Sequence, residues 1–384
     1  MTGTHPLYLA RELAAQGALA AYYTALPPSR TRGVPPGLVH RHLALLVPLY
    51  ALMKGWSPIS EYRLESLIEQ RFDRWVSRHL VPADAVHALA GAGRRLRRAA
   101  KQRLGALAVC DSPTTHVRYR KALLQDEYAR WGRPVEDFDD RKIESVEAEY
   151  AESDLILAPS RFAYQSFVSH GVPAAKLALT PYGVDCREFS PVPRTNSRFR
   201  ILFVGNISIR KGVPYLLEAV SRLPWRDAEL AFRGREAEGD PSLLAGYRGA
   251  IPLSVIPPQP RSELKQTYSN ASVVVLPSIE DGFGLVIGQA LACGTPVIAT
   301  THTGGPDLIE DGVNGFIVPP RDVDALVSAL TRCYERRDAL AEMGREARRR
   351  MERARGWGAY ADSVVAACTQ ALGRRGTSTQ SAAR

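Results

Sequence analysis

Short apolar segments alternate with amphipathic, helix-like segments along most of this 384-residue chain. In the first half the strand-like segments are Ala85–Leu89, Ala106–Cys110, Leu155–Ala158 and Leu177–Thr180. In the second half they are Arg200–Val204, Glu229–Arg233, Ser272–Leu276 and Pro296–Thr300. Such alternation is typical of parallel sheets whose strands are joined by crossover helices. The sequence therefore predicts an α/β fold with one parallel sheet in each half.

A segment with two prolines and no apolar periodicity, Phe189–Arg198, separates the two halves. We interpret it as an interdomain linker. The predicted first domain covers residues 1–190 and is completed by a closing helix over 356–374, while the second domain covers 197–355. Residues 375–384 are expected to form a loose tail. Two such domains enclose a cleft, and ligands of parallel sheets bind beyond the carboxyl ends of the strands.

The first domain begins unusually. An amphipathic helix is predicted over His5–Gln16, and four residues precede it. A doubly wound domain normally opens with a buried strand before this helix, so we expect the opening strand to be missing. The start codon is placed too late, the chain is trimmed, or the sheet is one strand short; we favour the first two explanations.

The composition narrows the class of protein. Lys and Arg number 50 against 40 Asp and Glu, and the resulting net charge of +10 permits anionic partners. The longest uncharged apolar run has 11 residues, whereas a membrane span needs about 20. The five cysteines are widely spaced, and no pair has metal-ligand spacing. We therefore expect a cytoplasmic protein without structural zinc.

The most informative stretch is Ser278–Thr300, in which a strand, a glycine loop, a helix, a tight turn and a second strand follow one another. Gly282 and Gly284 allow the backbone to approach a ligand closely. The amides of Phe283, Gly284 and Leu285 open the helix and can bind an anion. The alternative is an ordinary strand-to-helix turn of any Rossmann-like domain.

Two polar side chains accompany this loop. Asp281 lies just before it, where a carboxylate can accept hydrogen bonds from sugar hydroxyls. Gln289 lies one to two turns into the helix, where its amide can bind a ribose diol.

Two further motifs belong to the second domain. In Val204–Gly212 a strand ends, Gly205 makes the turn, and Arg210 and Lys211 can neutralise a diphosphate. Taken alone, such a cationic pair is more often solvated. Thr303–Val318 contains a glycine pair and a second turn, and it could close over a ligand or simply form a turn.

In this order and spacing, the three motifs resemble the family-4 glycosyltransferases of the GT-B fold. Further matching segments are Ser153–Phe162, Thr180–Pro191 and Gln259–Ser278. The resemblance implies two Rossmann-like domains with parallel sheets that face each other across a cleft, and a C-terminal helix that returns to the first domain. It also implies a retaining, metal-independent transfer of a sugar from a nucleotide-diphosphate sugar to a hydroxyl acceptor, with no other cofactor.

The resemblance also suggests roles for individual residues. Lys211 and Arg210 would bind the diphosphate, Asp281 and the amides of residues 283–285 the sugar, and Gln289 the ribose. The chain departs from the family pattern here, because the family usually has two glutamates eight residues apart at the positions of Asp281 and Gln289.

Two neighbouring positions bear on this departure. Glu280 could partly substitute for the shorter Asp281 side chain. Many members also carry a basic residue directly after the glycine of the first turn, where this chain has Asn206.

The first domain contributes fewer candidates. The segment Cys110–His116 follows a strand and is expected to face the cleft, and His116 resembles the family histidine near the reacting sugar. The alternative is a solvated loop histidine. Glu127 could orient this histidine or face solvent, and we expect solvent. The loop containing Gly3 would face the donor phosphate.

The charge is unevenly distributed. The helix predicted over residues 94–104 carries six cations and no acid, whereas Glu136–Asp154 is mainly acidic and Arg345–Arg355 is mainly basic. The first cluster could contact an anionic membrane surface or a lipid-linked acceptor, or it could be a solvated face above an apolar stripe. A peripheral location at the inner membrane face is therefore an option. Nucleic acid is not an expected partner, because no recognition module is evident.

Three functions follow from these patterns. The favoured one is a retaining glycosyltransferase in the synthesis of a surface polysaccharide, a glycolipid or a glycosylated metabolite. Because of Asp281 and Gln289, the second is a sugar-nucleotide-binding protein without transfer activity. The third is a GT-B nucleotide-sugar epimerase.

Overall fold

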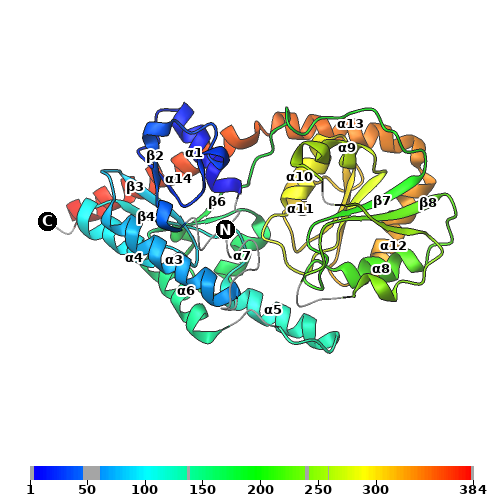
Figure 1. Ribbon diagram of the computed structural model, residues 1–384, viewed down its shortest axis with the longest axis horizontal. Coiled ribbons are helices and arrows are strands. Elements are labelled where there is room, and N and C mark those ends of the chain that lie inside the picture. Colours follow the sequence, from blue (N-terminus) through cyan, green and yellow to red (C-terminus); the bar gives the residue numbers. More distant parts are fainter. Residues whose placement is uncertain (1–3, 46–60, 136–138, 238–241, 258, 382–384) are drawn as a thin grey trace.

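The computed structural model describes residues 4–45, 61–135, 139–237, 242–257 and 259–381 (Figure 1). Two α/β domains lie side by side along its longest axis, each built on a parallel sheet (Figure 1). The predicted α/β fold with two parallel sheets is therefore confirmed.

The second domain contains a six-stranded parallel sheet in the order β12-β11-β10-β7-β8-β9. Its strands are β7 (Phe199–Val204), β8 (Ala228–Arg233), β9 (Leu253–Val255), β10 (Val273–Leu276), β11 (Val297–Thr300) and β12 (Gly315–Val318). Its helices are α8 (Val213–Ser221), α9 (Leu264–Ser269), α10 (Leu285–Ala292), α11 (Gly305–Leu308), α12 (Val323–Glu335) and α13 (Arg337–Arg353). Apolar side chains alternate along β7: Phe203 belongs to the buried cluster with α8 and α12, and Leu202 to the cluster with α10 and α13. Helices therefore cover both faces.

The first domain contains a four-stranded parallel sheet in the order β3-β4-β5-β6, and β1 and β2 form a separate parallel pair. The strands are β1 (Tyr22–Thr24), β2 (Val39–Arg41), β3 (Ala85–Leu89), β4 (Leu107–Asp111), β5 (Leu155–Ala158) and β6 (Leu177–Leu179). The helices are α1 (Thr4–Ala15), α3 (Glu61–Arg78), α4 (Arg94–Ala99), α5 (Val117–Arg130), α6 (Asp140–Glu152), α7 (Arg161–Val168) and α14 (Gly356–Ser381). The expectation of a missing opening strand stays a prediction.

The C-terminal helix α14 packs on the first domain. Trp357 and Tyr360 share a buried cluster with Leu9 of α1 and Leu107 of β4. Figure 1 shows α13 along the second domain and α14 beside α1. The chain therefore crosses back between the domains, as the family resemblance implies.

The expected loose tail is wrong for residues 375–381, which continue α14. Contacts at the start of this segment hold it on the first domain. Arg374 donates a hydrogen bond to the carbonyl oxygen of Ala175, and Arg375 pairs with the carboxylate of Asp154. These tertiary contacts compensate for the polar sequence.

The basic helix lies against the acidic one. Four of its cations form ion pairs in or just after α6: Arg94 and Arg98 with Glu152, Arg97 with Glu149, and Lys101 with Asp154. Arg97 is completely buried rather than solvated, and its guanidinium lies 2.6 Å from the Glu149 carboxylate. The helix also widens into a π-helical turn over Ala100–Leu104. Much of the predicted basic face is thus neutralised within the fold.

Candidate functional site

The loops after β7 and β10 pack directly against each other. Gly212 has a positive φ of 70°, and a Cβ atom there would lie 1.9 Å from the carbonyl oxygen of Pro277. The backbone amide of Ile279 donates to the carbonyl oxygen of Arg210 at 2.9 Å. This close approach brings the two predicted cations beside the predicted acidic residues.

The site contains two adjacent ion pairs. Lys211 Nζ lies 2.5 Å from Asp281 Oδ2, and Arg210 Nε lies 2.9 Å from Glu280 Oε2. Burial, followed by the neighbouring Arg210, lowers the pKa of Lys211, although Asp281 acts in the opposite direction. Burial favours a raised pKa for Asp281, but Lys211 and Arg210 bring it below its usual value. The site is thus a cluster of two ammonium or guanidinium groups and two carboxylates.

The amides at the start of α10 are oriented by Asp281. Its Oδ1 accepts hydrogen bonds from Gly284 N at 3.0 Å and from Phe283 N at 3.4 Å. Gly284 has a φ of 75°, and a Cβ atom there would lie 2.7 Å from the Leu276 side chain. Both the positive φ and the close packing therefore require glycine at position 284. Leu285 follows as the first residue of α10. The predicted anion site already holds a protein carboxylate.

The other predicted donor residues also have defined positions. Gln289 is mostly buried on α10, and its Oε1 accepts a hydrogen bond from the Tyr268 hydroxyl at 2.8 Å. Gly205 has a φ of 142° directly after β7, and a Cβ atom on Gly234 would lie 1.8 Å from its carbonyl oxygen. Gly3 lies outside the described residues.

The donor loop touches the first domain. Glu280 Oε1 accepts hydrogen bonds from the amide and hydroxyl of Thr115, at 3.3 and 2.9 Å. A Cβ atom on Gly282 would lie 2.0 Å from the carbonyl oxygen of Pro113, and the Ser160 hydroxyl donates to the Gly282 carbonyl. The segment after β4 therefore faces the second domain, and Pro113 and Thr115 make the contact.

His116 is turned into the first domain. It caps α5 by accepting a hydrogen bond from Arg118 N, and it is only 4% exposed. Its ring stacks on His170 at 4.6 Å and contacts Tyr150 and Phe167. Burial, followed by the charge of His170, lowers its pKa to about 4. This geometry accounts for His116 as a helix cap. The catalytic role of His116 stays a prediction.

A buried cluster at the end of β4 was missed by the sequence analysis. Asp111 lies 3.0 Å from the Nε2 atoms of both His5 and His87. Tyr182 stacks on His5 and meets the ring of Phe283 at 5.3 Å. Burial would raise the pKa of Asp111, but the two histidines lower it. An aspartate directly after a buried strand was the available signal, and its partners come from distant segments.

Glu127 is buried, whereas we expected it to face solvent. The side chain is completely buried and accepts hydrogen bonds from Trp131 Nε1, the Tyr215 hydroxyl and Arg321 Nε, at 3.0, 2.8 and 2.6 Å. The prediction failed because α5 reaches across to the second domain, whose Tyr215 and Arg321 enclose the carboxylate. Glu127 therefore links the two domains.

Within the described ranges, no helix is both long and apolar enough to cross a bilayer. The same part of the chain contains no cluster of three or more His, Cys, Asp or Glu side chains arranged to hold a metal ion.

Comparison with known families confirms the resemblance stated above. Residues 198–336 match the family Glycosyl transferases group 1. The chain is 33% identical over 255 residues to D-inositol 3-phosphate glycosyltransferase of Geodermatophilus obscurus, covering 60% of this chain and 56% of that protein. The enzyme of the same name from Xylanimonas cellulosilytica is 33% identical over 253 residues, covering 59% of each chain. The chain thus spans less than two thirds of these relatives.

Solved structures show the same fold over nearly the whole chain. Sucrose-phosphate synthase from Thermosynechococcus elongatus superposes with a TM-score of 0.69 and 20% identity, covering 95% of this chain and 92% of that one. Anabaena Alr3699/HepE in complex with UDP gives a TM-score of 0.67 and 15% identity, covering 96% and 97%. The chain has the GT-B fold of these proteins.

Proposed function

We propose that this chain, whose residues 198–336 match the group 1 glycosyltransferases, transfers a sugar from a nucleotide-diphosphate sugar to a hydroxyl acceptor. The proposal rests on the ion pairs of Arg210 and Lys211 with the 280–284 loop. The same loop contacts Pro113 and Thr115 of the first domain. One structural relative, Anabaena Alr3699/HepE, was crystallised with UDP and with UDP-glucose, which supports a nucleotide-sugar donor.

In this proposal the two cations act on the leaving group. As the bond to the sugar breaks, negative charge grows on the diphosphate, and preorganised cations lower the energy of that state. Lys211 and Arg210 are held in place by Asp281 and Glu280 before any ligand arrives. Asp281 would bind sugar hydroxyls and Gln289 the ribose. With the configuration retained at the sugar, the leaving diphosphate would accept the proton of the acceptor.

The finer features are also proposals. The half-buried cations Arg210 and Lys211 supply charge stabilisation, which supports a reaction that needs no metal ion. The names of the sequence relatives make D-inositol 3-phosphate the first acceptor to test, before polysaccharide, glycolipid or other metabolite acceptors. A lipid-linked acceptor, a cytoplasmic site of action and membrane contact through residues 94–104 remain proposals, the last with less charge available because four cations are paired.

The function is tested by incubating the protein with a panel of nucleotide sugars and D-inositol 3-phosphate, with and without a chelator. We expect a glycosylated product that keeps the anomeric configuration of the donor, measured by proton NMR, and equal rates with chelator. Donor binding without transfer to any acceptor or hydrolysis would favour the binding protein. Release of an epimerised sugar nucleotide would favour the epimerase.

Gly282→Ala is expected to lower the transfer rate about tenfold, because the new Cβ atom would meet the Pro113 carbonyl oxygen and displace the two domains. UDP affinity should change much less, since the cations lie on the second domain alone. Steady-state kinetics and calorimetry measure the two effects. Gly246→Ala is the matched control, because no atom lies within 4 Å of its Cβ position. Equal rates in the two variants would contradict the proposed role of the contact between Gly282 and Pro113.

A further inference from the structure

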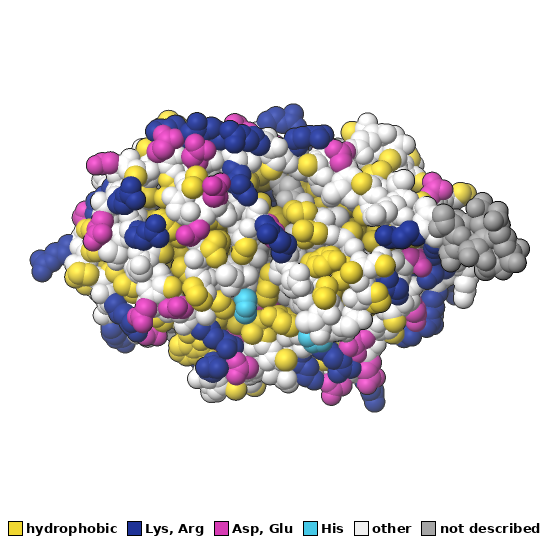
Figure 2. All heavy atoms as spheres, turned by 180° about the vertical axis from the view of Figure 1, so that it is seen from behind, with side chains coloured by type: hydrophobic (Ala, Val, Ile, Leu, Met, Phe, Trp, Pro, Cys, Tyr) yellow, Lys and Arg dark blue, Asp and Glu magenta, His cyan; other side chains and the backbone are white. Residues whose placement is uncertain are grey.

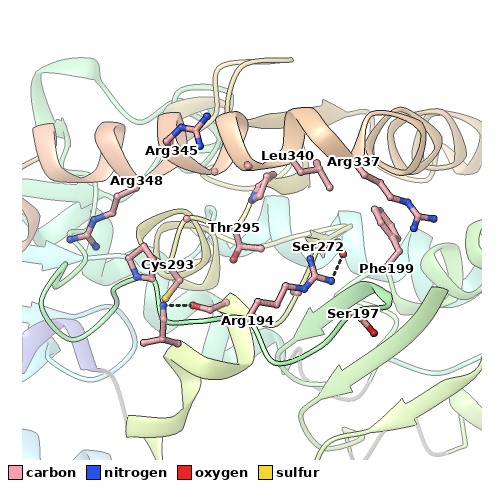
Figure 3. A pocket seen from close by; sticks show the side chains of 18 of the residues that line it. Arg194, Ser197, Phe199, Ser272, Cys293, Thr295, Arg337, Leu340, Arg345 and Arg348 are labelled. Atoms are coloured by element: carbon pink, nitrogen blue, oxygen red, sulfur yellow. Dashed lines mark hydrogen bonds between the residues drawn. The ribbon is translucent and has the colours of Figure 1, made fainter. Parts of the chain in front are cut away.

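A cavity of about 690 Å³ lies at the amino ends of strands in the second-domain sheet (Figure 3). Phe199 opens β7, and Ser272 and Pro296 directly precede β10 and β11; all three line the cavity. The predicted donor residues instead follow the carboxyl ends of these strands. Because the strands are parallel, the two sites are separated by the length of the sheet.

The cavity is lined by arginines. Its described lining contains no Asp or Glu, and its arginines are Arg194, Arg198, Arg337, Arg345, Arg348 and Arg349. Four of them are paired with acids outside the lining: Arg337 with Asp227, Arg345 with Glu342, Arg348 with Glu352, and Arg349 with Glu342 and Glu346. Figure 2 shows basic and acidic side chains together along the edge where α13 lies.

The remaining two arginines, Arg194 and Arg198, form no ion pair with a described residue. Arg194 donates hydrogen bonds to the carbonyl oxygens of Asn196 and Arg198 and to the Ser272 hydroxyl. Burial, followed by the nearby Arg200, lowers the pKa of Arg194, against the effect of Glu229. The exposed Arg198 side chain has no ion pair with any described residue. An anion in the cavity would supply the missing negative charge.

The other walls are apolar. Phe199, Cys293, Pro296 and Leu340 contribute to the lining, and Figure 3 places Leu340 and Arg337 on α13 across from Arg194 and Ser272. A concave site with apolar walls and a few charged groups is typical of small-molecule binding. Guanidinium groups match the geometry of phosphate oxygens. The lining thus suits a molecule with an apolar body and one phosphate.

We propose that this cavity binds a phosphate monoester carried on a small apolar group, with the phosphate at Arg198 and Arg194 and the apolar group against Leu340 and Phe199. The site is independent of the donor site and of the proposed transfer reaction. Soluble phosphate esters and the headgroup of phosphatidate share this chemistry.

The test is calorimetric titration of the full chain with phenyl phosphate, phenol and inorganic phosphate. We expect phenyl phosphate to bind at least about tenfold more tightly than phenol or inorganic phosphate alone. Phenol contacts only the apolar residues, and inorganic phosphate only the arginines. Arg198→Glu should weaken phenyl phosphate binding about tenfold or more, and Arg198→Gln less. The hydrogen bonds of Arg198 to Arg194 and Asn196 use its backbone atoms, and its side chain pairs with no described residue, so both variants should fold.

Two controls separate this site from others. Arg248→Gln, which removes an exposed arginine bonded to backbone carbonyl oxygens, should leave phenyl phosphate binding unchanged. Lys211→Ala, at the donor site, should also leave it unchanged. Competition by phosphatidylcholine vesicles only when they contain phosphatidate would identify the lipid source, and no competition would identify a soluble one. Binding that is unaffected by Arg198→Glu, or lost in Lys211→Ala, would overturn the proposal.

Discussion

Lys211→Ala is expected to weaken the binding of a nucleotide diphosphate by roughly 10- to 150-fold, or about 1.5–3 kcal/mol, because the charge-assisted hydrogen bonds to the diphosphate are lost. The Lys211 side chain is only 16% exposed, so little solvent screens its charge. Calorimetric titration with UDP measures the change. Unchanged affinity would remove Lys211 from the proposed diphosphate site.

The same substitution also affects the unliganded protein. Asp281 would lose the partner 2.5 Å away and keep its hydrogen bonds from the amides of Phe283 and Gly284. Thermal unfolding of the variant must therefore be measured beside its affinity. Lys265→Ala, on α9 of the same domain, is the matched control and should bind UDP as the natural protein does. The double variant Lys211→Met/Asp281→Asn removes both charges; it should restore stability without restoring affinity.

The strands that could be predicted are the buried ones. Predicted strand Glu229–Arg233 differs from β8 by one residue, because its centre, Leu230–Phe232, is apolar, as expected for a parallel strand covered on both faces. Strands β1, β2 and β9 were not predicted. Each of these strands has only three residues, and most of those residues are partly exposed. Their sequences therefore show no clear alternation of apolar and polar residues.

The donor-side cluster was predictable because it depends on local loops at one edge of one sheet. Arg210 and Lys211 follow β7 and Asp281 follows β10, and neighbouring parallel strands bring their ends together. Contacts between the domains were not predictable in this way. Glu127 and Arg321 are separated by 194 residues, and their approach depends on how α5 meets the second domain. The direction of His116 likewise depends on the packing of Tyr150 and Phe167.

The sequence predicts where the basic and acidic segments lie along the chain, but not that they pair with each other. The sequence shows a basic segment and an acidic segment, and each alone suggests a solvated surface or a partner. In the fold they pair with each other, and Arg97 goes into the interior with Glu149. A helical pattern cannot distinguish a buried arginine from an exposed one, because the partner carboxylate lies on another helix.

Arg97→Ala is expected to lower the free energy of unfolding by about 3–5 kcal/mol, because it leaves the Glu149 carboxylate buried without its counter-charge. The carbonyl oxygens of Ala88 and Leu89 would also lose their hydrogen bonds from Arg97. Urea denaturation measures the loss. The neighbouring Arg98→Ala is the matched control: its side chain is 53% exposed beside Glu152, so solvent screens the pair and the loss should be much smaller.

A second variant separates the charge from the volume of the side chain. Arg97→Met/Glu149→Leu removes both charges while keeping apolar bulk, and it should recover much of the stability lost in Arg97→Ala. The recovery should be incomplete, because Glu149 also accepts a hydrogen bond from Gly91 N, at 2.9 Å, and that amide would lose its partner. If Arg97→Ala costs no more than Arg98→Ala, the Arg97–Glu149 pair does not hold α4 against α6, and the basic segment is free to serve another surface.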